Sequence, residues 1–162
     1  YAVGESPEEF LTEALELLEE QHEFDRLKVH WTEHGPGIEE AYQELSEAYG
    51  PEMQAQLSTL KEAELAQKVW RLIEDAYERL RTVHGRRGTR LVLFGTKAVE
   101  QAADTLFQQG EMAAFRGERK EARNVFERAF DLDPQPRYTD AIETHCNTYE
   151  EALPKVEDML AN

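Results

Sequence analysis

Two pairs of residues have the spacing that metal binding or thiol chemistry would need, and the first is a pair of histidines. His30 and His34 are four residues apart, as two zinc ligands on one helical turn can be. Gly35-Pro36 follows at once, no third ligand is evident, and no glutamate stands in the position that zinc proteases use. We therefore interpret both histidines as incidental and predict no metal site.

The second pair, His145-Cys146, has the residue types of a thiol nucleophile and its base. Adjacent residues on a helix do not face each other, and His145 falls on the apolar stripe of the expected helix while Cys146 is one step off it. We interpret Cys146 as a structural cysteine that is buried or partly buried.

Carboxylates are abundant, but their setting does not indicate catalysis. Asp131 and Asp133 lie in a loop that is too short and proline-rich for a calcium site. The glutamates of 7–20 and 38–52 have no histidine, asparagine or aromatic pocket around them, which favours a solvated face. The sequence has no glycine-rich phosphate loop and no Gly-x-Ser-x-Gly motif. We predict no catalytic residues and no cofactor.

An enzyme of unknown type stays open as an alternative. It would require a pocket in which at least two members of one small set converge. The set is His30, His34, Glu39 and His84.

Charge is the strongest feature of the composition. The 162 residues carry a net charge of -16, and residues 1–62 hold sixteen acidic residues against Arg26, Lys28 and Lys61. This half would repel nucleic acid and anionic membranes and would attract a basic protein surface. Solubility alone is the other explanation of such an acidic excess.

One basic cluster follows the acidic half, and it consists of Arg79, Arg81, Arg86, Arg87 and Arg90. It could meet an acidic partner or the acidic half of this same chain, and we favour the internal pairing. A single cysteine, Cys146, excludes an internal disulfide and suits a reducing cytoplasm. No apolar stretch approaches the roughly 20 residues of a membrane span, and no signal peptide is evident.

These residues must be positioned by helices, because the apolar periodicity is helical wherever it is clear. Ser6-Pro7 starts a helix that ends near His22, with Glu9 completing a capping box. A second helix covers 38–49 and is stopped by Pro51. Thr59 and Glu62 form a capping box for a third helix, which we expect to end at His84-Gly85.

The second half of the chain has the same helical periodicity after one ambiguous segment. Residues 86–94 include "TRLVLF", which has strand propensity but no partner strand, so we expect a short helix or an irregular packed segment. Helical stripes follow from Lys97, with a tight turn at 116–118, a break at 133–136 and a final helix at 137–153. The sequence therefore predicts an all-α protein.

Residues 24–95 carry four pieces in the order and spacing of a J domain, the module of DnaJ-type co-chaperones. These pieces are "FDRLKVHW", "IEEAYQELSEAYGPE", "VWRLIEDAYERL" and "RRGTRLVLFG". The chain resembles that family over about seventy residues. In the family a His-Pro-Asp tripeptide follows the second helix and is needed to stimulate the heat-shock ATPase.

Two departures from the family bear on activity. Gly50-Pro51-Glu52 stands where the family has His-Pro-Asp, so only the proline is retained. The family's second helix is basic, whereas here it carries only acids as its charged residues, namely Glu39, Glu40, Glu44 and Glu47. Like charges across the ATPase interface would oppose binding. The resemblance therefore implies a J-like fold that does not stimulate the heat-shock ATPase.

Residues 103–136 resemble one tetratricopeptide repeat, a 34-residue helix pair. Five residues stand at that family's small, apolar and proline positions, and these are Gly110, Ala122, Phe126, Ala129 and Pro134. The resemblance implies a groove on the first helix, lined by Asp104, Phe107, Glu111 and Phe115. The Lys and Asn of carboxylate-clamp repeats are missing. One repeat seldom stands alone, so we expect the final helix to cap it.

Together these expectations describe an N-terminal helix at 1–22, either extra or a linker, a J-like domain at 23–95, and a tetratricopeptide-like pair with a capping helix at 96–162. We predict a non-enzymatic interaction or scaffolding module within a larger bacterial regulatory protein. Its partner-binding residues would be Glu39, Glu40, Glu44, Glu47, Phe107, Glu111 and Phe115. An active co-chaperone and a structural spacer are the alternatives.

Overall fold

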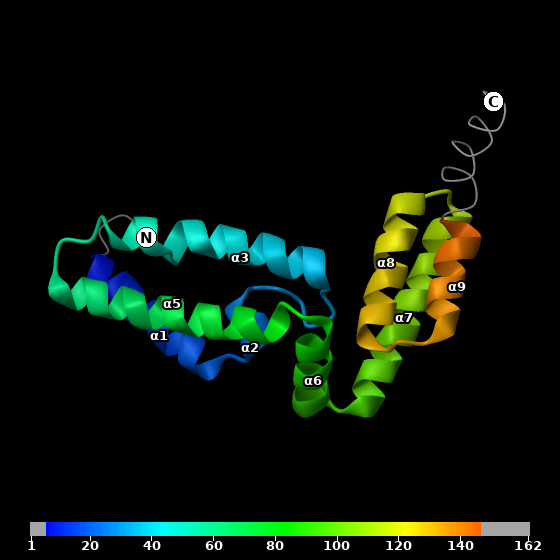
Figure 1. Ribbon diagram of the computed structural model, residues 1–162, viewed down its shortest axis with the longest axis horizontal. Coiled ribbons are helices and arrows are strands. Elements are labelled where there is room, and N and C mark those ends of the chain that lie inside the picture. Colours follow the sequence, from blue (N-terminus) through cyan, green and yellow to red (C-terminus); the bar gives the residue numbers. More distant parts are fainter. Residues whose placement is uncertain (1–5, 147–162) are drawn as a thin grey trace, which may run out of the picture. The chain divides into compact units, whose positions relative to one another are not determined.

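The computed structural model describes residues 6–146, and in this range every regular element is an α-helix (Figure 1). Nine helices follow one another in the described residues, which confirms the all-α prediction. They form two compact units, of which the first reaches Thr89 and the second begins at Arg90. None of these helices is long and apolar enough to cross a membrane.

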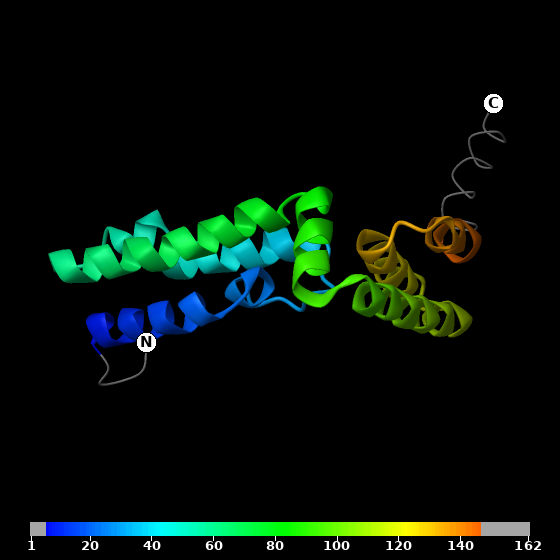
Figure 2. The same cartoon turned by 90° about the horizontal axis from the view of Figure 1, so that it is seen from below.

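Unit 1 is built around the long helix α5 (Leu60–Leu80). Helix α1 (Pro7–Glu20) lies along it, and Lys61 Nζ pairs with Glu8 Oε1 at 3.0 Å near the start of both helices. Helix α3 (Gly35–Tyr49) packs antiparallel to α5 (Figures 1 and 2). The N-terminal helix therefore belongs to unit 1 by its packing.

The core of unit 1 comes from the apolar stripes of these three helices and from the short helix α2 (Glu23–Arg26). Phe24 and Leu27 are fully buried. They belong to the apolar segment that follows α1, and this segment packs against α5 instead of lying on the surface. The fully buried aliphatic side chains include Leu11, Leu27, Ile38, Val69, Ile73 and Leu80.

Capping residues set several helix starts as expected from the sequence. Ser6 Oγ accepts a hydrogen bond from the Glu9 N–H at 3.2 Å. At α5 both halves of the predicted capping box are present, since Thr59 Oγ1 accepts from the Glu62 N–H and the Glu62 side chain accepts from the Thr59 N–H. Helix α3 starts at Gly35, three residues before the predicted start, because Pro36 suits the first turn.

The end of α5 differs from the prediction. The helix ends at Leu80 instead of His84-Gly85, and a separate helix, α6 (Val83–Phe94), follows after two residues. Thr82 Oγ1 accepts from the Gly85 N–H at 3.0 Å, which satisfies one donor in the first turn of α6. The "TRLVLF" segment is thus helical. The predicted domain division lay after residue 95, and the boundary between the units falls inside α6.

Unit 2 is a helical hairpin of α7 (Thr96–Phe115) and α8 (Arg119–Leu132), with α9 (Pro136–His145) packed on α8. The predicted tight turn lies at Arg116–Glu118 between them, where Gly117 has φ of 78°, a left-handed value that favours glycine. A Cβ atom at Gly110 would lie 2.5 Å from Cε1 of Phe126, so the two helices approach closely at this point.

The final helix was expected to reach residue 153. Helix α9 ends at His145, Cys146 is its cap, and the expected apolar positions Tyr149 and Leu153 lie outside the described residues.

Candidate functional site

The four predicted glutamates of α3 lie on the solvent side of that helix. Glu39, Glu40, Glu44 and Glu47 are all exposed, whereas Ile38, Leu45 and Tyr49 of the same helix are buried. The helix contains no Lys or Arg. Its outer face therefore carries four negative charges with no cation among them.

An aromatic stack lies beside this face, where α3 meets α5. The rings of Tyr42 and Tyr77 are parallel within 8°, with centroids 3.8 Å apart, and the Trp70 ring also stacks on Tyr42, with centroids 5.5 Å apart. The Tyr77 hydroxyl donates to both carboxylate oxygens of Glu39, each at 2.8 Å. The contact fixes one of the predicted glutamates in place.

Two further glutamates, Glu74 and Glu78 of α5, add to the negative field around the stack. Burial raises the pKa of the Tyr42 hydroxyl, and the nearby charges of Glu74, Glu39 and Glu78 raise this pKa further. The side chain of Arg81 lies next to the stack. Its guanidinium carbon is 5.8 Å from the Tyr77 ring centroid, and its Nη1 is 3.5 Å from Glu78 Oε2. We call the exposed acids of α3 together with Glu74 and Glu78 the acidic face.

Sequence reasoning missed Glu74 and Glu78. The sequence did contain a signal for them. Glu74 and Glu78 are four residues apart on α5, so they share one face of that helix, and Tyr77 between them belongs to its apolar stripe. Only the pairing of α3 with α5 places them beside the predicted glutamates.

Gly50-Pro51-Glu52 forms the junction between α3 and the single-turn helix α4 (Pro51–Gln54). Gly50 is buried, and its N–H donates to Ser46 O at 2.8 Å, while Pro51 and Glu52 are exposed. A Cβ atom at Gly50 would collide with the backbone oxygen of Ser46. Position 50 therefore has no room for the histidine side chain that J domains carry there.

The four predicted groove residues on α7 do not form one open groove. Phe107 is half-buried, with Phe126 and Tyr138 at ring distances of 5.8 Å and 5.5 Å. Arg137 of α9 lies over the Phe107 ring at 5.2 Å and pairs with Asp104 at 3.4 Å. Helix α9 thus covers the first half of the set.

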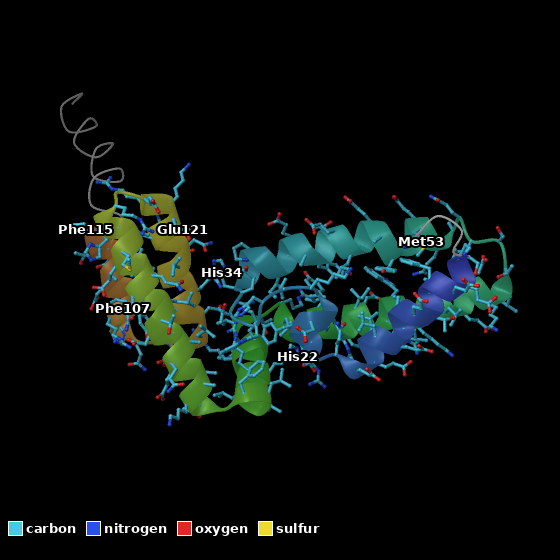
Figure 3. The ribbon with its side chains drawn as sticks, turned by 180° about the vertical axis from the view of Figure 1, so that it is seen from behind. His22, His34, Met53, Phe107, Phe115 and Glu121 are labelled. Carbon is cyan, nitrogen blue, oxygen red and sulfur yellow. The ribbon has the colours of Figure 1, made fainter. Side chains whose placement is uncertain are left out.

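The second half of that set stays open. Glu111 is exposed, and Phe115 is 94% exposed at the end of α7 (Figure 3). Met112 is exposed on the neighbouring turn. The residues Phe107 and Phe115 therefore have different environments, one packed and one free of the hairpin core.

The histidines point to local contacts instead of a shared site. His30 Nδ1 lies 2.8 Å from Thr32 Oγ1, and His34 Nδ1 lies 3.0 Å from Glu33 Oε1. Within residues 6–146 no group of three His, Cys, Asp or Glu side chains could hold a metal ion. Glu39, the carboxylate of the alternative enzyme site, binds Tyr77.

Cys146 has the environment expected of a structural cysteine. Its side chain is buried in a cluster with Ala113, Ala122 and Phe126, and burial raises the pKa of its thiol. A raised thiol pKa lowers the thiolate fraction, and the thiolate is the nucleophile. His145 instead stacks on Phe126 at a centroid distance of 6.1 Å.

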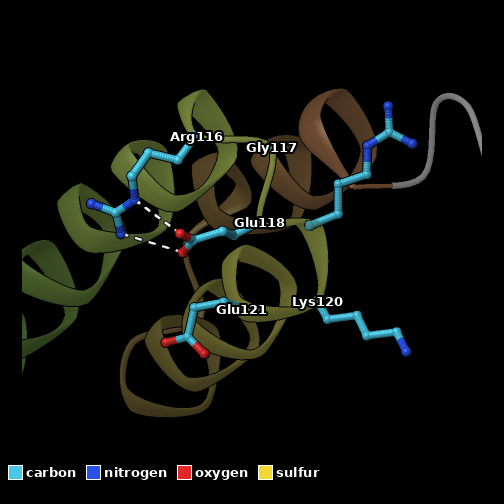
Figure 4. A pocket seen from close by; sticks show the side chains of 6 residues that line it. Arg116, Gly117, Glu118, Lys120 and Glu121 are labelled. Carbon is cyan, nitrogen blue, oxygen red and sulfur yellow. Dashed lines mark hydrogen bonds and ion pairs between the residues drawn. The ribbon is translucent and has the colours of Figure 1, made fainter.

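An open hollow of about 890 Å³ lies at the turn between α7 and α8 (Figure 4). Its lining is charged and hydrophilic, and Arg116 pairs there with Glu118, with Nε to Oε1 at 3.3 Å. The hollow has the character of an exposed turn, without an apolar floor to hold a ligand.

No family model, curated protein or solved structure matches the chain.

Proposed function

We propose that this protein is a non-enzymatic interaction module whose acidic face binds a basic surface on a protein partner. One observation carries the proposal: all four glutamates of α3 are exposed, and no cation lies among them on that helix. Electrostatic complementarity of this kind speeds association and discriminates between partners.

The rigidity of the face supports the same function. The stack of Trp70, Tyr42 and Tyr77 joins α3 to α5, and the Tyr77 hydroxyl holds the Glu39 carboxylate by donating its one hydrogen between the two oxygens. Side chains that are held before binding lose less conformational entropy when the partner arrives. Glu39, held in this way, is therefore better suited to recognition than a mobile glutamate of equal charge.

We further propose that unit 1 is a J-like domain that does not stimulate the heat-shock ATPase. The antiparallel pair of α3 and α5, joined through Gly50-Pro51-Glu52, supports the resemblance of the sequence to that family. The acidic α3 and the missing space at Gly50 argue against the family's activity. Unit 2 would be a tetratricopeptide-like pair in the same cytoplasmic bacterial regulatory or scaffolding protein.

The test is capture of partners from cytosol on the immobilised full chain, at low and moderate salt. Glu40→Lys/Glu44→Lys should lose a partner that the wild type retains, because the substitution reverses two charges of the acidic face. Glu16→Lys/Glu19→Lys is the matched control, with the same charge change at exposed positions of α1. An equal loss in both variants would show that net charge matters and the face does not.

The same experiment separates the alternatives. Recovery of the heat-shock ATPase in an ATP-dependent manner, abolished by Pro51→Ala, would establish a co-chaperone. Capture of no partner at either salt concentration would favour the structural spacer.

A further inference from the structure

A second surface of unit 1 lies between α1 and α3, and it is apolar. A hollow of about 230 Å³ lies between α1 and α3, and α5 contributes Ile73 to its lining. Leu17 is 57% exposed at its edge and presents apolar surface to a ligand in the hollow. Its apolar lining is Phe10, Ala14, Leu17, Leu18, Leu45 and Ile73.

Two cations and one carboxylate, that of Glu13, line the same hollow, so the charge of its lining is positive although this half of the chain is strongly acidic. Residues 1–62 contain three basic residues, and Lys61 is paired with Glu8. The other two, Arg26 and Lys28, both line the hollow, and within residues 6–146 neither forms an ion pair with a carboxylate. Arg26 Nε donates to the Leu18 carbonyl at 2.8 Å, at the last turn of α1.

Tyr49 adds a hydrogen-bond donor to the lining. It is 9% exposed, and its ring stacks on Phe10 with centroids 6.0 Å apart. No group among residues 6–146 forms a hydrogen bond with its hydroxyl, and burial alone raises its pKa. Buried hydroxyl groups are almost always hydrogen-bonded, so this hydroxyl is available to an acceptor beyond residues 6–146, such as a ligand in the hollow.

A second apolar hollow, of about 310 Å³, lies on the other side of Phe10. Phe10 lines both hollows, so its ring divides the groove into two sites. The lining of the second hollow includes Pro7, Leu11, Ala48, Met53 and Leu57. A ligand that used both hollows would need two separate apolar groups.

The polar groups are spread along the groove. Tyr49 stacks on Phe10 in the first half of α1, whereas Arg26 bonds to Leu18 in the last turn. At 1.5 Å per residue these points are about 12 Å apart along α1. An extended peptide covers about 12 Å with roughly four residues.

We propose that the groove between α1 and α3 binds the C-terminal end of a partner polypeptide whose last residue is apolar. The terminal carboxylate lies at Arg26 and Lys28, and the last side chain fills the hollow beside them. A backbone carbonyl further along accepts from the Tyr49 hydroxyl. An apolar side chain about three residues earlier occupies the hollow beyond Phe10.

Two observations favour a polypeptide over an acyl chain of the same charge. The Phe10 ring interrupts the groove, and Tyr49 needs an acceptor partway along it, which an acyl chain lacks.

The probe is a fluorescein-labelled hexapeptide, Gly-Ser-Leu-Gly-Ser-Leu, with a free C-terminus, titrated with the full chain at low salt. Fluorescence polarisation should show binding at least about 10-fold tighter than for the C-terminal amide, which lacks the charge. An array with Leu, Phe, Met or Val at the two apolar positions covers different side-chain sizes. Equal affinity for acid and amide, or no binding across the array, would overturn the proposal.

Single substitutions test the role of each polar group in peptide binding. Lys28→Gln should weaken the free acid about 3- to 10-fold and leave the amide unchanged, whereas Tyr49→Phe should weaken both by a similar factor. Lys61→Gln is the matched control, since it removes the same charge away from the groove. An equal loss in Lys61→Gln, or displacement of the peptide by octanoate at lower concentration than the free peptide requires, would refute the polypeptide site.

Discussion

The ring of Phe126 occupies the space beside Gly110, so that a Cβ atom at residue 110 would lie 2.5 Å from Phe126 Cε1. Phe126 is fully buried and cannot swing into solvent. We expect Gly110→Ala to destabilise unit 2 by about 1–3 kcal/mol, because the ring or the helices must move. Urea denaturation followed by far-UV circular dichroism would measure the change.

Gly88 provides the matched control for this substitution. It lies inside α6, and a Cβ atom there would meet no heavy atom within 4 Å. Gly88→Ala should therefore stabilise the protein by up to about 0.5–1 kcal/mol, the usual gain when alanine replaces glycine in a helix. If both variants behaved alike, the close approach of α7 and α8 at Gly110 would be disproved.

The junction at Gly50 gives a second prediction. Gly50→His should destabilise unit 1 by about 1–3 kcal/mol, because its Cβ atom would collide with the Ser46 carbonyl. Glu52→Asp, at an exposed position, should change stability by no more than about 0.5 kcal/mol. Thermal unfolding measures both, and wild-type stability in Gly50→His would show that the junction can accept the side chain of the J-domain motif.

The third prediction concerns the ion pair of Arg90 and Asp131 within unit 2. Arg90 is fully buried, and its Nη1 lies 2.8 Å from Asp131 Oδ2. Asp131→Ala should cost about 3–5 kcal/mol, because it leaves a buried cation without this carboxylate. Glu118→Ala removes an exposed pair with Arg116 and should cost only about 0–1 kcal/mol. Similar losses in the two variants, measured by urea denaturation, would contradict the burial of Arg90.

Stability at high pH is the fourth prediction. Burial raises the pKa of Tyr42, Tyr49, Tyr77 and Tyr138 above the ordinary value of 10.0, and at Tyr138 a hydrogen bond from Arg137 acts in the opposite direction. A higher pKa in the folded state means that folding favours the protonated hydroxyl. This contribution is complete below pH 10.0 and is lost as the pH rises through the folded-state pKa values.

Absorbance at 295 nm would follow the tyrosines directly. These four tyrosines should titrate above pH 10.0 in the folded protein and near that value in concentrated urea. The free energy of unfolding should stay level up to about pH 9 and then fall. Coincident titration curves for the folded and unfolded protein would show that the hydroxyls are not buried.

Local signals predicted much of the fold. The capping box of Thr59 and Glu62 formed as expected, because it depends on two residues three apart. The end of α5 was wrong for the opposite reason. Helical periodicity continues past Leu80, but Arg86 turns back to donate to the Leu80 carbonyl at 3.0 Å. That contact requires a bend that no short-range pattern specifies.

The basic cluster shows the same limit. The sequence favoured pairing with the acidic half of the chain, and Arg79 does lie 3.8 Å from Glu23. Arg90, however, pairs with Asp131, 41 residues further on. Charge content predicts that arginines will find carboxylates, but the partner follows from how the helices pack.

Four of the six glutamates of the acidic face could be predicted from the sequence. Periodicity placed the four glutamates of α3 outside, because the apolar residues of that helix define its buried stripe. Glu74, Glu78 and the stack of Tyr42 with Tyr77 depend on the register of α3 against α5. The cover of Phe107 by Tyr138 likewise depends on where α9 lies.

The aromatic stack also makes the two units optically distinct. The chain has two tryptophans, Trp31 and Trp70, and both lie in unit 1. Tryptophan emission therefore reports the unfolding of unit 1 alone, while circular dichroism reports the helices of both units. If the two signals change at different urea concentrations, each unit is an independent cooperative block, and coincident transitions mean that the two share a single melting event.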